Sequence, residues 1–118
     1  MKYMLLVYLD EQALSETERN QCYVESAALT QDLNKSGHYL HASPLHSVAT
    51  ATSVRMRAGR RLITDGPFAE TREQLGGFYL IEANDLDEAI GIAERVPPAK
   101  FGTVEIRPVM EIEGLPAN

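Results

Sequence analysis

The stretch that decides the fold is an uninterrupted apolar run near the start of the chain, Tyr3-Met4-Leu5-Leu6-Val7-Tyr8-Leu9, which ends at Asp10. A half-buried strand alternates apolar and polar residues, whereas a short run that is apolar throughout is typical of a central strand covered on both faces. The segment Phe78-Tyr79-Leu80-Ile81 repeats this pattern. The sequence therefore predicts two central strands that both need protein on each side.

The remaining pattern predicts the order in which the elements follow. Ser15 is a good N-cap for a helix over residues 15–35, and Gly37 follows its last turn. A second helix is expected over residues 86–96, and further strands over residues 39–42, 48–57, 61–64, 76–83 and 104–112. This order predicts an α+β, ferredoxin-like βαββαβ fold with an inserted hairpin and an antiparallel sheet that carries two helices on one face.

Two helices cover only one face of such a sheet. The central strands nevertheless carry apolar residues on both faces, so the second face needs a cover of its own. A second copy of the chain is the simplest cover, and we expect a homodimer in which two sheets pack face to face. The alternative is a monomer whose outer sheet face is coated in another way.

Composition limits the class of protein. The 118 residues are 44% hydrophobic with a net charge of −6, which fits one domain over residues 1–118. Basic residues are scattered apart from four arginines in residues 55–61, so we expect no nucleic-acid partner. The single cysteine, Cys22, excludes an internal disulfide, and the first apolar run is too short for a signal core or a membrane span. We therefore expect a cytoplasmic protein without a membrane partner.

The turn at residues 65–71, Asp-Gly-Pro-Phe-Ala-Glu-Thr, places a carboxylate where a strand ends. Loops on a rigid scaffold concentrate binding and catalytic groups, so Asp65 could serve as a general base or orient a histidine. The alternative is structural, because an Asp-Gly-Pro sequence also favours a turn in which the aspartate accepts backbone N–H groups. The residues alone leave both interpretations open.

Four segments of the chain, residues 3–8, 49–55, 64–83 and 102–109, together resemble the YCII-related proteins of the DGPF type. The resemblance implies the dimeric α+β barrel superfamily, and it implies no particular reaction. Relatives in the wider group are thought to use a histidine–aspartate pair in a cleft, and Asp65 matches that aspartate. Where we expect a histidine or an aromatic residue before the Gly-Thr-Val-Glu segment, this chain has Phe101. His41, or else His46, is then the candidate partner of Asp65.

The first functional hypothesis is a cofactor-independent small-molecule enzyme. Its pocket would lie between sheet and helices with Tyr8, Phe68 and Tyr79 as walls, and Asp65 with His41 would carry out acid–base or orienting chemistry. Arg55 would bind an anionic substrate, although a cross-strand ion pair at the surface or the dimer edge is the commoner role for such an arginine. No cofactor motif and no metal-ligand spacing is present, so neither a cofactor nor a metal is expected.

The second hypothesis is a non-catalytic module. The same pocket would bind a metabolite, or the homodimer would dock a regulatory partner. Members of the resembled family are often encoded beside transcription-factor genes, which favours such a role. A histidine close to Asp65 would discriminate between the two hypotheses.

Overall fold

Four strands form one antiparallel sheet in the order β2-β5-β1-β6, with β5 and β1 at its centre. These strands are β1 (Lys2–Leu9), β2 (Tyr39–Pro44), β5 (Gln74–Glu82) and β6 (Thr103–Pro108). The computed structural model, which describes residues 1–116, thereby confirms the predicted ferredoxin-like α+β fold. The two apolar runs are its two central strands, as their composition predicts. The sheet of one chain stays open and forms no closed barrel.

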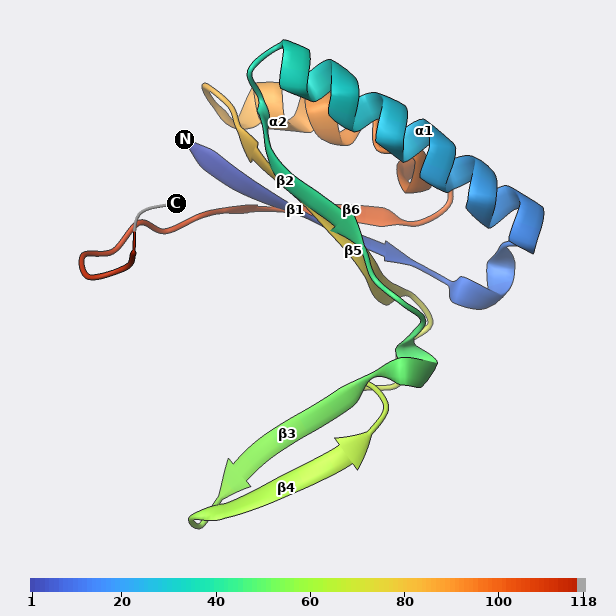
Figure 1. Ribbon diagram of the computed structural model, residues 1–118, viewed down its shortest axis with the longest axis vertical. Helices are drawn as coiled ribbons and strands as arrows, with labels where there is room; N and C mark the ends of the chain where they lie inside the picture. Colours follow the sequence, from blue (N-terminus) through green and yellow to red (C-terminus); the bar gives the residue numbers. More distant parts are fainter. Residues whose placement is uncertain (117–118) are drawn as a thin grey trace.

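Both helices, α1 (Glu16–Lys35) and α2 (Leu86–Ala93), lie on one face of this sheet (Figure 1). Helix α1 begins at a capping box, in which the Ser15 hydroxyl accepts the Glu18 N–H at 3.1 Å and the Glu18 carboxylate accepts the Ser15 N–H at 3.0 Å. Three short 3₁₀ turns, η1 (Glu11–Ala13), η2 (Val48–Thr50) and η3 (Pro97–Lys100), connect the elements.

Alternation along the central strands divides their side chains between two faces. Tyr3, Leu5 and Val7 of β1 are buried against the helices, together with Tyr79 and Ile81 of β5. Leu29 and Leu33 of α1 and Ala89 and Ile92 of α2 complete this core. The residues between them point to the opposite side of the sheet, because successive side chains of a strand alternate.

We call this opposite side the open face, since no helix covers it. Leu6 pairs with Phe78 on one side and Glu105 on the other, and Met4 pairs with Leu80 and Arg107. The open face thus has an apolar centre of Met4, Leu6, Phe78 and Leu80. Polar residues of β2 and β6 form its margins.

The inserted hairpin, β3 (Thr52–Arg57) with β4 (Arg60–Asp65), forms a separate two-stranded sheet that projects from the body (Figure 1). We call it the arm. Its turn uses positive φ angles at Ala58 (49°) and Gly59 (74°), as a two-residue hairpin loop of this kind requires. The radius of gyration is 16.1 Å, whereas a compact chain of this length has about 13.5 Å. Projecting segments account for the excess.

Three of the predicted bounds differ from the structure by three residues or more. The strand expected over residues 48–57 begins only at Thr52, because Ser47 caps a 3₁₀ turn at Val48–Thr50. The helix expected over residues 86–96 ends at Ala93. The last strand, expected to run to residue 112, ends at Pro108, because β1 begins at Lys2 and offers no neighbour to the residues beyond.

We predict that the contact between β1 and the turn before β6 tolerates no side chain at Gly102. A methyl group there would overlap the carbonyl oxygen of Tyr8 and lie 3.2 Å from the Leu9 Cα atom. Gly102→Ala should therefore lower the free energy of unfolding by about 2 kcal/mol or more. Gly91→Ala is the control, since open space surrounds this glycine of α2, and helix propensity should raise stability by about 0.5–1 kcal/mol. Urea unfolding measures the stability of both variants. Equal unfolding midpoints for Gly102→Ala and the wild type would contradict the prediction.

Candidate functional site

A groove of about 990 Å³ lies between α1 and the sheet. Its sheet side includes Val7 of β1 and Tyr79 of β5, and its helix side includes Tyr23, Ser26 and Thr30 of α1. These three α1 residues follow one another at i, i+3 and i+7 and so share a face of the helix. Apolar walls with a few hydroxyl groups are typical of a small-molecule site.

The phenol of Tyr79 is the most enclosed polar group of the groove. The side chain is only 6% exposed, and burial raises the pKa of this phenol above its ordinary value of 10.0. Because the raised pKa keeps the proton on oxygen at neutral pH, Tyr79 is able to donate a hydrogen bond but not to act as a base. A carbonyl or carboxylate oxygen of a ligand would be a suitable acceptor.

Glu11 holds one end of the groove in place. Its carboxylate accepts hydrogen bonds from the Ser47 hydroxyl at 2.9 Å and the Val48 N–H at 3.0 Å. Arg19 of α1 donates to the Glu11 carbonyl oxygen at 2.9 Å. These bonds tie η1, α1 and the root of the arm together, so the groove is bounded by a fixed frame at this end.

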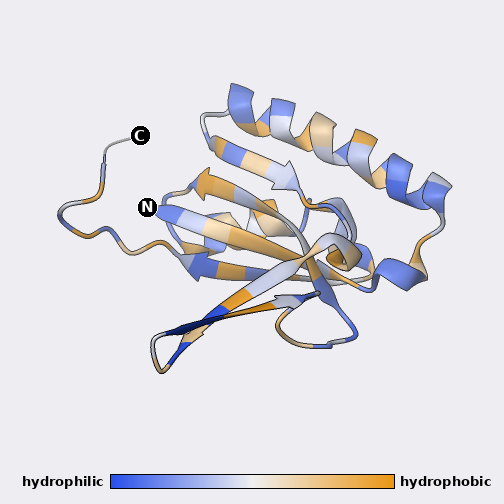
Figure 2. Ribbon diagram, turned by 60° about the horizontal axis from the view of Figure 1, so that its bottom comes forward, coloured by the Kyte–Doolittle hydropathy of each residue, from blue (hydrophilic) through white to orange (hydrophobic). Residues whose placement is uncertain are grey.

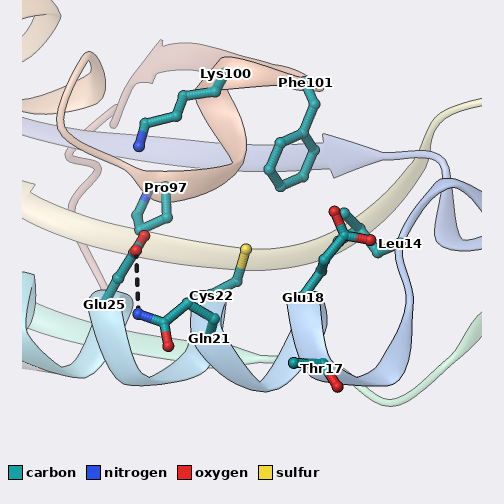
Figure 3. Close-up of a pocket in the computed structure, with 9 residues that line it drawn as sticks. All are labelled: Leu14, Thr17, Glu18, Gln21, Cys22, Glu25, Pro97, Lys100 and Phe101. Carbon is teal, nitrogen blue, oxygen red and sulfur yellow. Dashed lines mark hydrogen bonds between the residues drawn. The ribbon is translucent and has the colours of Figure 1, made fainter.

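A smaller cavity of about 380 Å³ lies on the other side of α1, against η3 (Figure 3). Cys22, Glu25, Lys100 and Phe101 are among its lining residues. Cys22 lines the large groove as well, so its thiol can report on both cavities. Burial and the nearby carboxylate of Glu25 raise the pKa of this thiol, although Lys100 opposes the shift.

The structure does not join Asp65 to His41 within one chain. Asp65 ends β4 on the arm and is exposed, opposite Thr52. His41 lies on the open face beside Leu80, with its ring centroid 5.6 Å from that of Phe78. Among residues 1–116 no hydrogen bond or ion pair connects the two side chains, and their pairing stays a prediction.

The turn after Asp65 is held by other groups. The Gly66 N–H donates to the Ala51 carbonyl at 2.7 Å, and the Ser53 hydroxyl donates to the Gly66 carbonyl at 2.9 Å. Across the described chain the Asp65 carboxylate accepts no backbone N–H of the turn. The carboxylate is therefore not needed to close the turn it begins.

Of the other residues predicted for the site, the structure places Tyr79 in the groove, and His46, the alternative partner of Asp65, lines it as well. Tyr8 faces the opposite side of the sheet, where its hydroxyl donates to Glu105 at 3.3 Å. Phe68 is 81% exposed in the loop that follows the arm, and Arg55 is exposed on β3. A pocket walled by all three predicted aromatic residues does not form within one chain.

Sequence reasoning missed the hydroxyl groups of α1 and the role of Glu11. Ser26 and Thr30 occupy helix positions where an amphipathic helix would place large apolar residues, and this departure was the available signal. Nothing local to Glu11 indicates its bonds to Ser47 and Val48, because its partners lie 36 and 37 residues away. Within residues 1–116 no three His, Cys, Asp or Glu side chains gather as metal ligands.

The fold and the groove together define a small α+β protein of the ferredoxin-like class with an open groove beneath its long helix. The chain belongs to the YCII-related family, whose domain model matches residues 1–113. An uncharacterised protein from Rhizobium meliloti (strain 1021) is 36% identical over 114 residues, which span 92% of each chain. No helix in the described part of the chain is long and apolar enough to cross a membrane.

We predict that Cys22 reacts slowly with iodoacetamide at neutral pH. Alkylation requires the thiolate, and burial shifts the pKa of this thiol above 9.0. About 1% or less of the thiol is therefore ionised at pH 7, and the rate should rise with a midpoint above pH 9. The control is the same chain in concentrated urea, whose midpoint should fall to about 8.5. A folded-state midpoint at or below the urea value would contradict the assignment.

Proposed function

We propose that this protein binds a small, largely apolar molecule in the groove beneath α1 and that it does so as a homodimer. The groove itself carries the proposal, because about 990 Å³ of space is bounded by apolar walls, several hydroxyl groups and the buried phenol of Tyr79. A ligand with an aromatic or aliphatic body and one carbonyl or carboxylate group fits this lining. As a member of the resembled DGPF type, the protein would act as a non-catalytic metabolite-binding or regulatory module.

The open face supports the homodimer. Met4, Leu6, Phe78 and Leu80 form an apolar centre, which water would otherwise contact. Polar margins follow on both sides, with His41 on β2 and with Glu105 and Arg107 on β6, where Glu105 also accepts a hydrogen bond from Tyr8 of β1. An apolar centre with a polar rim is the usual anatomy of a protein interface. Two such faces are self-complementary, as a two-fold interface requires.

A second candidate function is cofactor-independent acid–base catalysis with Asp65 and His41. One observation favours it: His41 lies on the face that a second copy would cover, and Asp65 lies on an arm that extends beyond this body. The pair would then form between two chains, with Arg55 near an anionic substrate. The binding function is preferred because the groove exists in each chain, whereas the pair needs contributions from both.

We predict that filling the groove abolishes ligand binding. Ala27 lines the groove and the adjacent Ala28 does not, so Ala27→Phe and Ala28→Phe are a matched pair. Thermal-shift screening of phenols and small aromatic acids should find compounds that stabilise the wild type and Ala28→Phe. The same compounds should bind Ala27→Phe about tenfold more weakly or worse, a loss of about 1.4 kcal/mol.

Two results would count against this assignment. Equal binding by Ala27→Phe would place the ligand elsewhere. Chemical turnover of a bound compound that is lost in Asp65→Asn would favour the catalytic function, since this change removes a base while the bonds of Gly66 and Ser53 still close the turn.

We predict that a charge on the open face prevents dimer formation. Leu6→Glu would bury an unpaired carboxylate at the apolar centre and should weaken the dimer about 100-fold or more, as measured by sedimentation equilibrium. Val24→Glu is the control, because Val24 is exposed on α1. Leu6 points away from the helix-side core, so the chain should remain folded. A wild-type chain that sediments as a monomer at micromolar concentration would refute the homodimer.

A further inference from the structure

Two segments of the chain project from the body: the arm and residues 110–116, which we call the tail (Figures 1 and 2). Val54 and Met56 of the arm are 61% and 59% exposed. Met110 and Ile112 of the tail are 81% and 57% exposed. An isolated two-stranded hairpin is marginally stable in water at best, so both segments need a surface to cover their apolar side chains.

The two segments have complementary patterns. Strand β3 reads Val54-Arg55-Met56-Arg57, and the tail reads Met110-Glu111-Ile112-Glu113. Side chains of an extended chain alternate between two faces. Each segment thus has one apolar face and one charged face, and the charges are opposite. Within residues 1–116 none of these four charged side chains forms an ion pair.

The distribution of charge along the chain favours a second copy of this protein as the partner of the arm. Residues 52–65 hold four of the eleven basic side chains and only one acidic side chain, Asp65. The rest of the chain is left with seven basic against sixteen acidic side chains. A basic arm on an acidic body is attracted to another copy of that body, and opposite charges across an interface also set its orientation.

The arm and the tail of one chain leave the sheet at opposite ends. The tail follows Val109, whose N–H donates to the Lys2 carbonyl at 2.9 Å, at the start of β1. The arm emerges after Pro44, which pairs with Gly77 beside Val7, near the end of β1. A strand of this length separates the two ends by about 20 Å or more. In the proposed homodimer the two sheets stack, and a two-fold axis perpendicular to the strands makes the strands of the two sheets run in opposite directions. The arm of one chain then lies near the tail of the other.

We propose that residues 110–113 of one chain add as a third strand to the outer edge of β3 in a second copy. Glu111 and Glu113 then lie on the same face as Arg55 and Arg57, and Met110 and Ile112 pack beside Val54 and Met56. Strand addition supplies main-chain hydrogen bonds to an edge that is otherwise unpaired. The inference rests on the homodimer proposed above and adds a contact that stabilises it. The tail of each chain pairs with the arm of the other.

Reversal of the charges tests this exchange. Arg55→Glu with Arg57→Glu, or Glu111→Arg with Glu113→Arg, should each raise the dimer dissociation constant about tenfold or more, because attraction becomes repulsion at both arms. A chain that carries all four changes should recover to within about threefold of the wild type. Asp87→Arg on α2 with Glu94→Arg at its C-cap is the control for net charge and should leave the dissociation constant unchanged.

Hydrogen exchange supplies a second measurement. Amides of residues 110–113 make no backbone hydrogen bond in the isolated chain, so they should exchange rapidly in the Leu6→Glu monomer and slowly in the dimer. A wild-type dimer whose tail exchanges as fast as in the monomer, or whose affinity does not recover in the fourfold variant, overturns the exchange while leaving the homodimer intact. A wild-type monomer overturns both.

Discussion

The architecture depends on one constraint: β1 and β5 are apolar on both faces, and residues 1–116 provide only two α-helices to cover them. On one face of the sheet, α1 and α2 cover Tyr3, Leu5 and Val7. Met4, Leu6, Phe78 and Leu80 alternate with these core residues and meet no helix. Burial of apolar surface is the main favourable contribution to folding and association, so the apolar centre of the open face is the surface on which the proposed homodimer depends.

The same constraint explains why the helix side of the sheet is free to hold a ligand. The proposed contacts between chains use the open face. The groove beneath α1 is on the other face of the sheet, and all its walls come from a single chain. Small hydroxyl side chains at Ser26 and Thr30 keep α1 from filling this space, and Glu11 ties the helix entrance to the root of the arm. Tyr79 and Phe78, neighbours on β5, therefore face opposite sides of the sheet, Tyr79 the groove and Phe78 the open face.

The sequence predicts the fold well because its signals are local. The apolar runs indicate central strands, Ser15 and Gly37 mark the ends of α1, and residues 58–60 mark a tight turn. The last strand was extended too far for a physical reason, since residues 109–112 have the alternating pattern of a strand but no neighbouring strand within their own chain. Site geometry is harder to predict because it depends on distant contacts, such as those of Glu11 with Ser47 and Val48.

The position of Asp65 changes what its motif means. The aspartate begins the most distinctive turn of the chain, yet Gly66 and Ser53 close that turn without help from its carboxylate, and within the described residues no histidine contacts it. The turn connects the arm back to the sheet, so it sets where the arm points. A turn that sets the direction of the arm would serve the proposed contact between the arm of one chain and the tail of the other, whether or not the protein catalyses a reaction. The acidic turn is thus accounted for by architecture first, and chemistry at Asp65 requires a partner supplied by the second chain.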